Sequence, residues 1–168
     1  NIKPDIVCCG KGAGSGFPLS IVLGKKKIMD LPDVGEMSST HSANPLACVI
    51  GKATIEEIDK KKLINNSKIK GLFLHRELNK FKKQFPKLVK YIFGKGLVAS
   101  IIFNKNYSKQ INLIVEKIGD ECFKNGLIVI KTGRESLKIA PPLSISHSAL
   151  KEGIEIIQNS IKRVSMKQ

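Results

Sequence analysis

The sequence predicts an α/β protein, because short apolar runs alternate with segments of helical periodicity along its 168 residues. Residues 4–9 and 19–23 form continuous apolar runs bounded by Pro or Gly, which is typical of strands covered on both faces. Apolar residues then recur at helical spacing over 44–59. Asn44 is a good N-cap for this helix, and Pro45 suits its first position.

The second half of the chain predicts a compact α/β unit. Helical periodicity resumes over 67–82 and the character of the sequence changes near Pro86. Beyond that point we expect strands at 91–93, 96–103, 126–130 and 137–140, with helices at about 108–124 and 147–163. The glycine-rich segment 10–16 is expected to be a loop between the first two strands.

The charge of the chain raises the question of an anionic partner. A formal net charge of +15 attracts nucleic acid or anionic membranes. However, the only arginines among the 29 basic residues are Arg76, Arg134 and Arg163, and phosphate and base recognition favour the arginine fork. The lysine clusters at 25–27 and 60–62 lack interleaved aromatics for base stacking. Composition therefore favours solvated lysine-rich faces, and a basic nucleic-acid-binding module is the alternative from another functional class.

The cysteines and histidines give no sign of a metal site. Cys8, Cys9, Cys48 and Cys122 have no C-x-x-C spacing, and three scattered histidines form no ligand pattern. No signal peptide precedes the cysteines, so we expect free thiols in a reducing cytoplasm. No apolar run approaches the roughly 20 residues that a membrane-spanning helix needs, and we expect no membrane partner.

Lys11 is the first candidate functional residue. It lies between Gly10 and Gly12 after a predicted strand, where α/β sheets bind ligands and glycines allow close approach. The order of residues matches neither a phosphate-binding P-loop nor a dinucleotide-binding G-x-G-x-x-G. A desolvated lysine can form a Schiff base with an aldehyde. An isolated Gly-Lys-Gly, by contrast, is more often a turn with its lysine in water.

Three longer segments occur in a characteristic order. They are PDIVCCGKGAGSGFPLSIVLG at 4–24, STHSANPLACVIGKATIEEI at 39–58 and LKIAPPLSIS at 137–146. Together they resemble the carboxyl-terminal half of a class III aminotransferase, a pyridoxal-phosphate enzyme of fold type I, the aspartate-aminotransferase type. The resemblance covers nearly the whole chain.

The resemblance implies an organisation into two parts. Residues 1–65 correspond to the end of the large domain that binds pyridoxal phosphate, and residues 66–168 to a small carboxyl-terminal α/β domain with its linking helix. The family's amino-terminal half supplies the aromatic that stacks on the cofactor ring and the aspartate that pairs with its pyridine nitrogen. Neither can be placed in this sequence, so we expect the chain to be a fragment that is inactive alone.

The resemblance also assigns cofactor-binding roles. The lysine of the family's PDIxxxGK segment forms the internal aldimine with the cofactor, and the match falls on Lys11. Thr40 matches the hydroxyl residue that contacts the cofactor phosphate across the interface of a homodimer with a shared active site. Ser39 and Thr40 precede a predicted helix start, where hydroxyls and free N–H groups favour phosphate. The alternative for Thr40 is a capping or turn role.

The substrate-binding residues depart from the family pattern. Many members carry an arginine in R-x-A-P-P-L that binds a substrate carboxylate, and this sequence has Lys138 there. A lysine supplies the charge without the bidentate fork. Arg134 is a second candidate for the anion contact, or else a surface ion-pair partner. His41, where relatives often have an aromatic, is either a pocket residue or a structural histidine.

The function implied by the resemblance is transamination. An amino acid or ω-amino acid would donate its amino group, and a 2-oxo acid would accept it. The expected cofactor is pyridoxal 5'-phosphate, and no metal is expected. Aminomutases and decarboxylases on the same scaffold are the alternatives, because they use the same lysine and cofactor.

Overall fold

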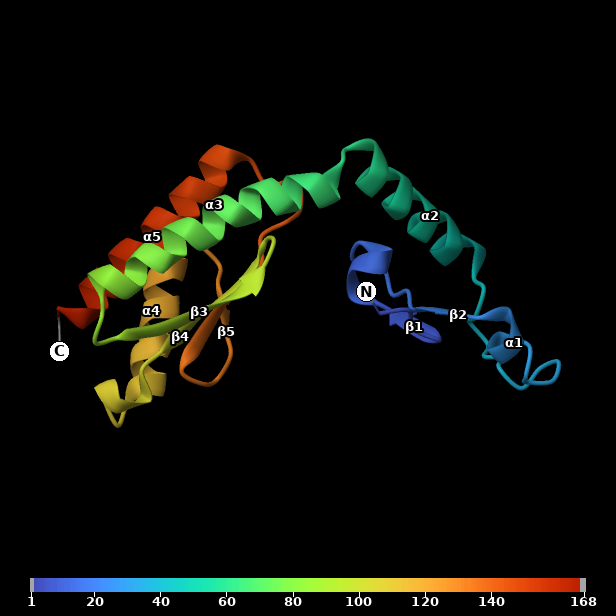
Figure 1. Cartoon of the computed structure of the whole chain (residues 1–168), viewed down its shortest axis with the longest axis horizontal. Coiled ribbons are helices and arrows are strands. Elements are labelled where there is room, and N and C mark those ends of the chain that lie inside the picture. Colours follow the sequence, from blue (N-terminus) through green and yellow to red (C-terminus); the bar gives the residue numbers. More distant parts are fainter. Residues whose placement is uncertain (1, 167–168) are drawn as a thin grey trace. The chain divides into compact units, whose positions relative to one another are not determined.

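The computed structural model describes residues 2–166 and divides the chain into two compact units, Asn1–Lys62 and Leu63–Gln168. The division lies within a few residues of the domain boundary expected at 65/66. Both units combine helices with strands (Figure 1). Each unit is described by itself below.

The first unit holds a two-stranded antiparallel sheet and one long helix. Its elements are β1 (Ile6–Cys9), the 3-10 helix η1 (Lys11–Gly14), β2 (Ile21–Gly24), the short helix α1 (Lys26–Met29) and α2 (Pro45–Lys60). The register pairs Ile6 with Gly24 and Cys9 with Ile21, so η1 and the residues after it connect the two strands at the end where β1 finishes. The segment expected as a plain loop at 10–16 therefore contains one helical turn.

The N-terminus of α2 confirms the predicted cap. The Asn44 Oδ1 accepts hydrogen bonds from Leu46 N at 3.0 Å and Ala47 N at 3.3 Å, and Pro45 begins the helix. Further along, an added Cβ at Gly51 would lie 2.7 Å from Leu19 Cδ2. The lack of a side chain at Gly51 thus leaves room for Leu19, in the connection that follows η1, to lie close to α2.

β1 and β2 form as expected, but within this chain their apolar side chains are not covered on both faces. Ile6 is 48% exposed and Leu23 is 57% exposed, and Val7 and Val22 are also exposed. The physical reason is that β1 and β2 pair only with each other among the described residues, so their apolar side chains lack a second layer to pack against.

The second unit is built around a four-stranded antiparallel sheet with the strand order β3-β4-β6-β5. In chain order its elements are α3 (Leu63–Gln84), β3 (Val89–Lys95), β4 (Val98–Phe103), the 3-10 helix η2 (Lys105–Tyr107), α4 (Ile111–Lys124), β5 (Ile130–Lys131), β6 (Ser136–Ile139) and α5 (His147–Ser165). The helices and the β3–β4 hairpin follow the predicted order and lie within a few residues of the predicted bounds.

One face of this sheet forms the core. Ala99, Ile101 and Phe103 alternate along β4 and are buried, as is Leu137 of β6. Helices α3 and α4 contact the sheet, and α5 packs against both of them (Figure 1). The core side chains of α3 recur at helical spacing, namely Leu74, Leu78 and Phe81.

The opposite face carries exposed apolar side chains. We call this the open face and define it by Tyr91, Phe93, Val98, Ile130 and Lys138, all of which are exposed. The Tyr91 and Phe93 rings lie 5.6 Å apart on β3, an edge strand of the sheet. This face therefore combines exposed apolar side chains with two lysines, Lys138 of β6 and Lys95 of β3, the register partner of Val98.

The strand predicted at 126–130 is mostly absent. Only Ile130 and Lys131 pair with β6. The preceding residues instead end α4, because Leu127 N donates to Cys122 O at 2.9 Å and Gly126 has a φ of 84°. Leu127 and Val129 pack against the core without joining the sheet ladder. A short apolar run alone does not distinguish these two outcomes.

The two units predict different behaviour for the 168-residue chain when it is made alone. Residues 87–163 have their own buried core and should exchange their amide hydrogens slowly. Residues 4–23 carry unpaired strand edges and exposed apolar faces, so they should exchange quickly and promote association. Hydrogen exchange measured by mass spectrometry tests this, and strong protection of residues 4–23 would contradict it.

Candidate active site

Lys11 lies directly beyond the carboxyl end of β1, as the first residue of η1. Its φ is 50°, in the left-handed region that costs a non-glycine residue about 1–2 kcal/mol. A Cβ added at Gly10 or at Gly12 would meet nothing within 4 Å, so both flanks of Lys11 are open. An unfavourable backbone conformation beside open space is a combination that occurs at functional sites.

The Lys11 amine has no charged partner among residues 2–166. No ion pair or side-chain hydrogen bond of the described chain involves it, and the side chain is exposed. Other lysines differ, since Lys25 Nζ lies 2.6 Å from Asp5 Oδ1. Lys131 contacts both Asp120 and Glu116, and these carboxylates raise its pKa above the usual value. Lys11 is therefore free of ion pairs within the described chain, whereas two carboxylates hold Lys131 in place.

Ser39 and Thr40 lie in the turn before α2. The Ser42 hydroxyl donates to Ser39 O at 2.7 Å and accepts from Ser39 N at 3.3 Å, which closes this turn. Thr40 is exposed, and within the described chain its hydroxyl makes no hydrogen bond. The Thr40 side chain can therefore donate to an external oxygen. His41 is exposed beside it.

The helix N-terminus contributes less to an anion site than the sequence suggests. Asn44 already occupies the N–H groups of Leu46 and Ala47, and Pro45 has no N–H to offer. Thr40 also lies four residues before the cap rather than beside it. Hydroxyl groups, more than the α2 N-terminus, are thus the phosphate donors that this segment presents.

Lys138 occupies the open face of the second unit. On the neighbouring strands its register partners are Ser100 of β4 and Ile130 of β5. Its neighbour Leu137 points into the core, so strand alternation directs Lys138 to the opposite face. No carboxylate of the described residues forms an ion pair with Lys138. A cation without a partner on an apolar surface suits a carboxylate ligand.

Arg134 lies in the turn between β5 and β6, apart from the neighbours of Lys138. Its backbone N–H donates to Thr132 Oγ1, and Ser136 N donates to its carbonyl at 2.7 Å. The adjacent Glu135 pairs with Lys105 at 3.1 Å instead. Backbone hydrogen bonding and Lys105 hold the pKa of Glu135 below its usual value. The Arg134 guanidinium therefore remains exposed, without an ion pair in the described chain.

Sequence reasoning missed two side chains that contact the segment after Lys138. Asn66 and Lys70, from the first turns of α3, donate hydrogen bonds to the carbonyls of Leu143 and Ile145. The sequence contains a signal for Lys70, because positions 67, 70, 74, 78 and 81 follow helical spacing and polar residues thus continue a stripe that is apolar further along. This spacing does not include Asn66.

The residues of the first unit have the chemistry to hold pyridoxal phosphate, because Lys11 offers an amine that can bond to an aldehyde and Thr40 offers a hydroxyl for phosphate. In the second unit, Lys138 separately offers a charge that suits a carboxylate. Within residues 2–166, no three His, Cys, Asp or Glu side chains converge on one point where a metal could bind. All four cysteines are free thiols. No helix in that range has both the length and the apolar character to cross a membrane.

Comparison with known proteins identifies the family of this chain. The model for "Aminotransferase class-III" matches residues 1–161. Over 165 residues the chain is 34% identical to a mitochondrial ornithine aminotransferase of Arabidopsis thaliana, covering 96% of this chain and 34% of that protein. It is 30% identical over 162 residues to an acetylornithine aminotransferase of Clostridium acetobutylicum, covering 96% of this chain and 40% of that protein. It is 33% identical over 164 residues to an alanine/serine racemase of Pyrococcus horikoshii, covering 96% of this chain and 34% of that protein.

Solved structures agree. An ornithine aminotransferase from Plasmodium yoelii superimposes with a TM-score of 0.87 at 31% identity, over 98% of this chain and 42% of that one. An ornithine aminotransferase from Toxoplasma gondii superimposes with a TM-score of 0.89 over 98% of this chain and 38% of that one. At 24% sequence identity, this likeness supports the fold alone. The predicted α/β fold class is confirmed. The chain spans between 34% and 40% of the length of the curated relatives described above.

Proposed function

Because this chain belongs to the class-III aminotransferase family, we propose that it forms the lysine-bearing part of a pyridoxal-phosphate enzyme that transfers an amino group. The donor is an amino acid or ω-amino acid, and the acceptor is a 2-oxo acid. The observation that carries the proposal is Lys11, an exposed amine without a partner between open glycines at a strand end. The ornithine and acetylornithine aminotransferases among the relatives support an amino acid as donor.

Lys11 acts twice in this proposal. Its Nζ would hold the cofactor covalently. The freed Lys11 amine would then act as base and afterwards as acid, taking the proton from the substrate carbon and later giving a proton back. When bound, pyridoxal phosphate supplies an electron sink for the negative charge left on the substrate carbon. The open flanks of Lys11 leave its side chain free to move between the two positions.

The other residues bind and orient. Thr40, with Ser39 beside it, donates to the cofactor phosphate, in a homodimer that shares its active sites. Lys138 attracts the substrate carboxylate, and Arg134 is the second candidate for that contact. Each assignment uses a side chain that is exposed, and the Thr40 hydroxyl and the Lys138 amine have no partner within the described chain. The free thiols are compatible with a reducing cytoplasm, although several of the relatives are named as mitochondrial.

A second reaction on the same residues is racemisation. It is favoured by the 33% identity to the alanine/serine racemase, a relationship as close as those to the aminotransferases. A proton returned to the substrate carbon itself, rather than to the cofactor carbon, gives that outcome. Aminomutase and decarboxylase activities use the same groups. A transaminase turns over its donor repeatedly only when a 2-oxo acid removes the amino group from the enzyme, so multiple-turnover assays with and without the acceptor distinguish it from these alternatives.

Lys11 should be the residue that holds the cofactor. Reduction of the loaded enzyme with borohydride, followed by peptide mapping, should leave a pyridoxyl group on Lys11. An adduct found only within the 25–27 lysine cluster would contradict the assignment. The Lys11→Ala variant should lose turnover, because no amine remains to move the proton, while a Lys26→Ala control should keep it.

Thr40 should contribute to cofactor affinity. If its hydroxyl donates to phosphate, Thr40→Ala should weaken cofactor binding by about 1.5–3 kcal/mol, the range for a hydrogen bond to a charged group. Equilibrium dialysis or a fluorescence titration measures this. Ser38→Ala, which removes an exposed hydroxyl from the same segment, is the matched control. Equal affinity in Thr40→Ala and the original protein would leave Thr40 with a turn role only.

A further inference from the structure

The first turns of α3 carry a stripe of polar side chains that face two loops. We call Asn66, Ser67 and Lys70 the α3 polar stripe. All three are half-buried, and they continue the line of Leu74, Leu78 and Phe81 toward the start of the helix. The later turns of α3 pack apolar side chains against the sheet, whereas its first turns make hydrogen bonds through these three polar side chains.

One of the two loops follows directly from Lys138. Residues 140–146 connect β6 to α5 without strand or helix pairing of their own. The Asn66 amide donates to Leu143 O, and the Lys70 ammonium donates to Ile145 O. The bond to Ile145 O is partly buried, where a backbone carbonyl outside regular structure needs such a partner, whereas the bond to Leu143 O is exposed. Two side chains of α3 thus hold a segment more than 70 positions away in the sequence.

The prolines of this loop make the connection stiff. Pro141 and Pro142 follow within four positions of Lys138, and each has a φ fixed by its ring. The loop also closes on itself, since Ile145 N donates to Pro142 O at 3.0 Å. Fixing Leu143 and Ile145 against α3 therefore fixes the end of β6.

The second loop is the turn between β3 and β4. The Ser67 hydroxyl accepts a hydrogen bond from Leu97 N at 3.2 Å. An added Cβ at Gly71 would lie 2.5 Å from the Gly96 backbone, so helix and turn are in direct contact. β4 begins immediately after this turn and carries Ser100, the register partner of Lys138. The same part of α3 thus holds the beginning of β4 and the end of β6.

From these contacts we propose that Asn66 and Lys70 are positioning residues for the substrate carboxylate, acting through the loop at 140–146 on Lys138. The inference rests on the proposed role of Lys138. A lysine is a point charge on a flexible stem, and it lacks the rigid fork by which an arginine aligns itself with a carboxylate. The precision of a lysine site must therefore come from the backbone that carries it, and small displacements of a binding group reduce its effectiveness.

The test compares substitutions in the cofactor-loaded enzyme. Lys138→Met should raise the KM for a carboxylate-bearing donor by about 10-fold or more, as expected for a lost hydrogen bond to a charged group. Lys70→Met and Asn66→Ala should each raise it by about 2- to 10-fold, as expected for one ordinary hydrogen bond. The kcat should change little in all three variants, and Lys70→Arg should restore the KM because it keeps a donor.

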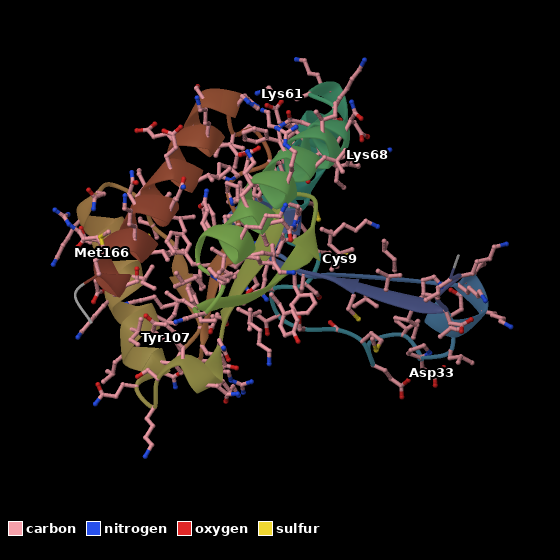
Figure 2. The ribbon with its side chains drawn as sticks, turned by 60° about the vertical axis from the view of Figure 1, so that its left-hand side comes forward. Cys9, Asp33, Lys61, Lys68, Tyr107 and Met166 are labelled. Carbon is pink, nitrogen blue, oxygen red and sulfur yellow. The ribbon has the colours of Figure 1, made fainter. Side chains whose placement is uncertain are left out.

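Two controls separate positioning from a general loss of stability. Lys68→Met makes the same change on an exposed part of the same helix (Figure 2), and it should leave the KM unaltered. An amine substrate without a carboxylate should show equal KM values in all variants.

A double variant tests whether Lys70 acts through Lys138. In the Lys138→Met background, Lys70→Met should raise the KM almost no further, because the effects of residues that act through one group are not additive.

The possible outcomes separate the two levels of the argument. If Lys138→Met raises the KM but Lys70→Met and Asn66→Ala do not, the positioning role is wrong and the role of Lys138 stands. If Lys138→Met leaves the KM unaltered, Lys138 does not bind the carboxylate and the positioning role falls with it. Hydrogen exchange adds a readout independent of activity, since residues 140–146 should exchange faster in Lys70→Met and Asn66→Ala than in Lys68→Met. Equal exchange in all three would also overturn the proposal.

Discussion

The packing of α3 against the antiparallel sheet is the interaction on which the second unit depends. Leu74, Leu78 and Phe81 place one face of the helix in a core that includes Ile101 and Phe103 of β4. Burial of such side chains contributes about 1.5–3 kcal/mol each. Because this face of α3 is fixed in the core, the α3 polar stripe at the beginning of the helix lies against the loop at 140–146 and the β3–β4 turn. A single helix thereby links the hydrophobic core to the surroundings of Lys138.

The first unit follows a different physical logic. Its two strands leave apolar side chains exposed, and Lys11 has a left-handed conformation with open flanks. Little of this arrangement is explained by stability, since a strained backbone and exposed Ile6 and Leu23 both cost free energy. The covalent role that we propose for Lys11 would give this conformation a function.

Local features of the sequence were the ones that could be predicted. The cap at Asn44, the helices and the β3–β4 hairpin depend on neighbours in the chain, and each was recognisable from spacing and residue type. The environment of β1 and β2 could not be read in this way, because a continuous apolar run specifies a buried strand only if other layers exist to cover it. The strand prediction at 126–130 was mostly wrong for a related reason. A segment that packs against a core without joining a sheet has the same apolar sequence as a buried strand.

Contacts between distant segments were beyond such reasoning. Nothing in the neighbourhood of Asn66 or Lys70 points to Leu143 and Ile145, because the pairing depends on how α3 lies along the sheet. Lys11 itself was recognised only through the longer segments around it, since Gly-Lys-Gly alone is equally a solvated turn. The departure at Lys138 was visible in the sequence, but its place on the open face between Ser100 and Ile130 needed the strand register.

A crystal structure of the cofactor-loaded enzyme would show whether the Lys11 amine holds the cofactor. We expect continuous electron density from Lys11 Nζ to the cofactor ring, with the phosphate in contact with a Thr40 hydroxyl. Density that joins the cofactor to another lysine, or a cofactor site that leaves Lys11 in solvent, would contradict it.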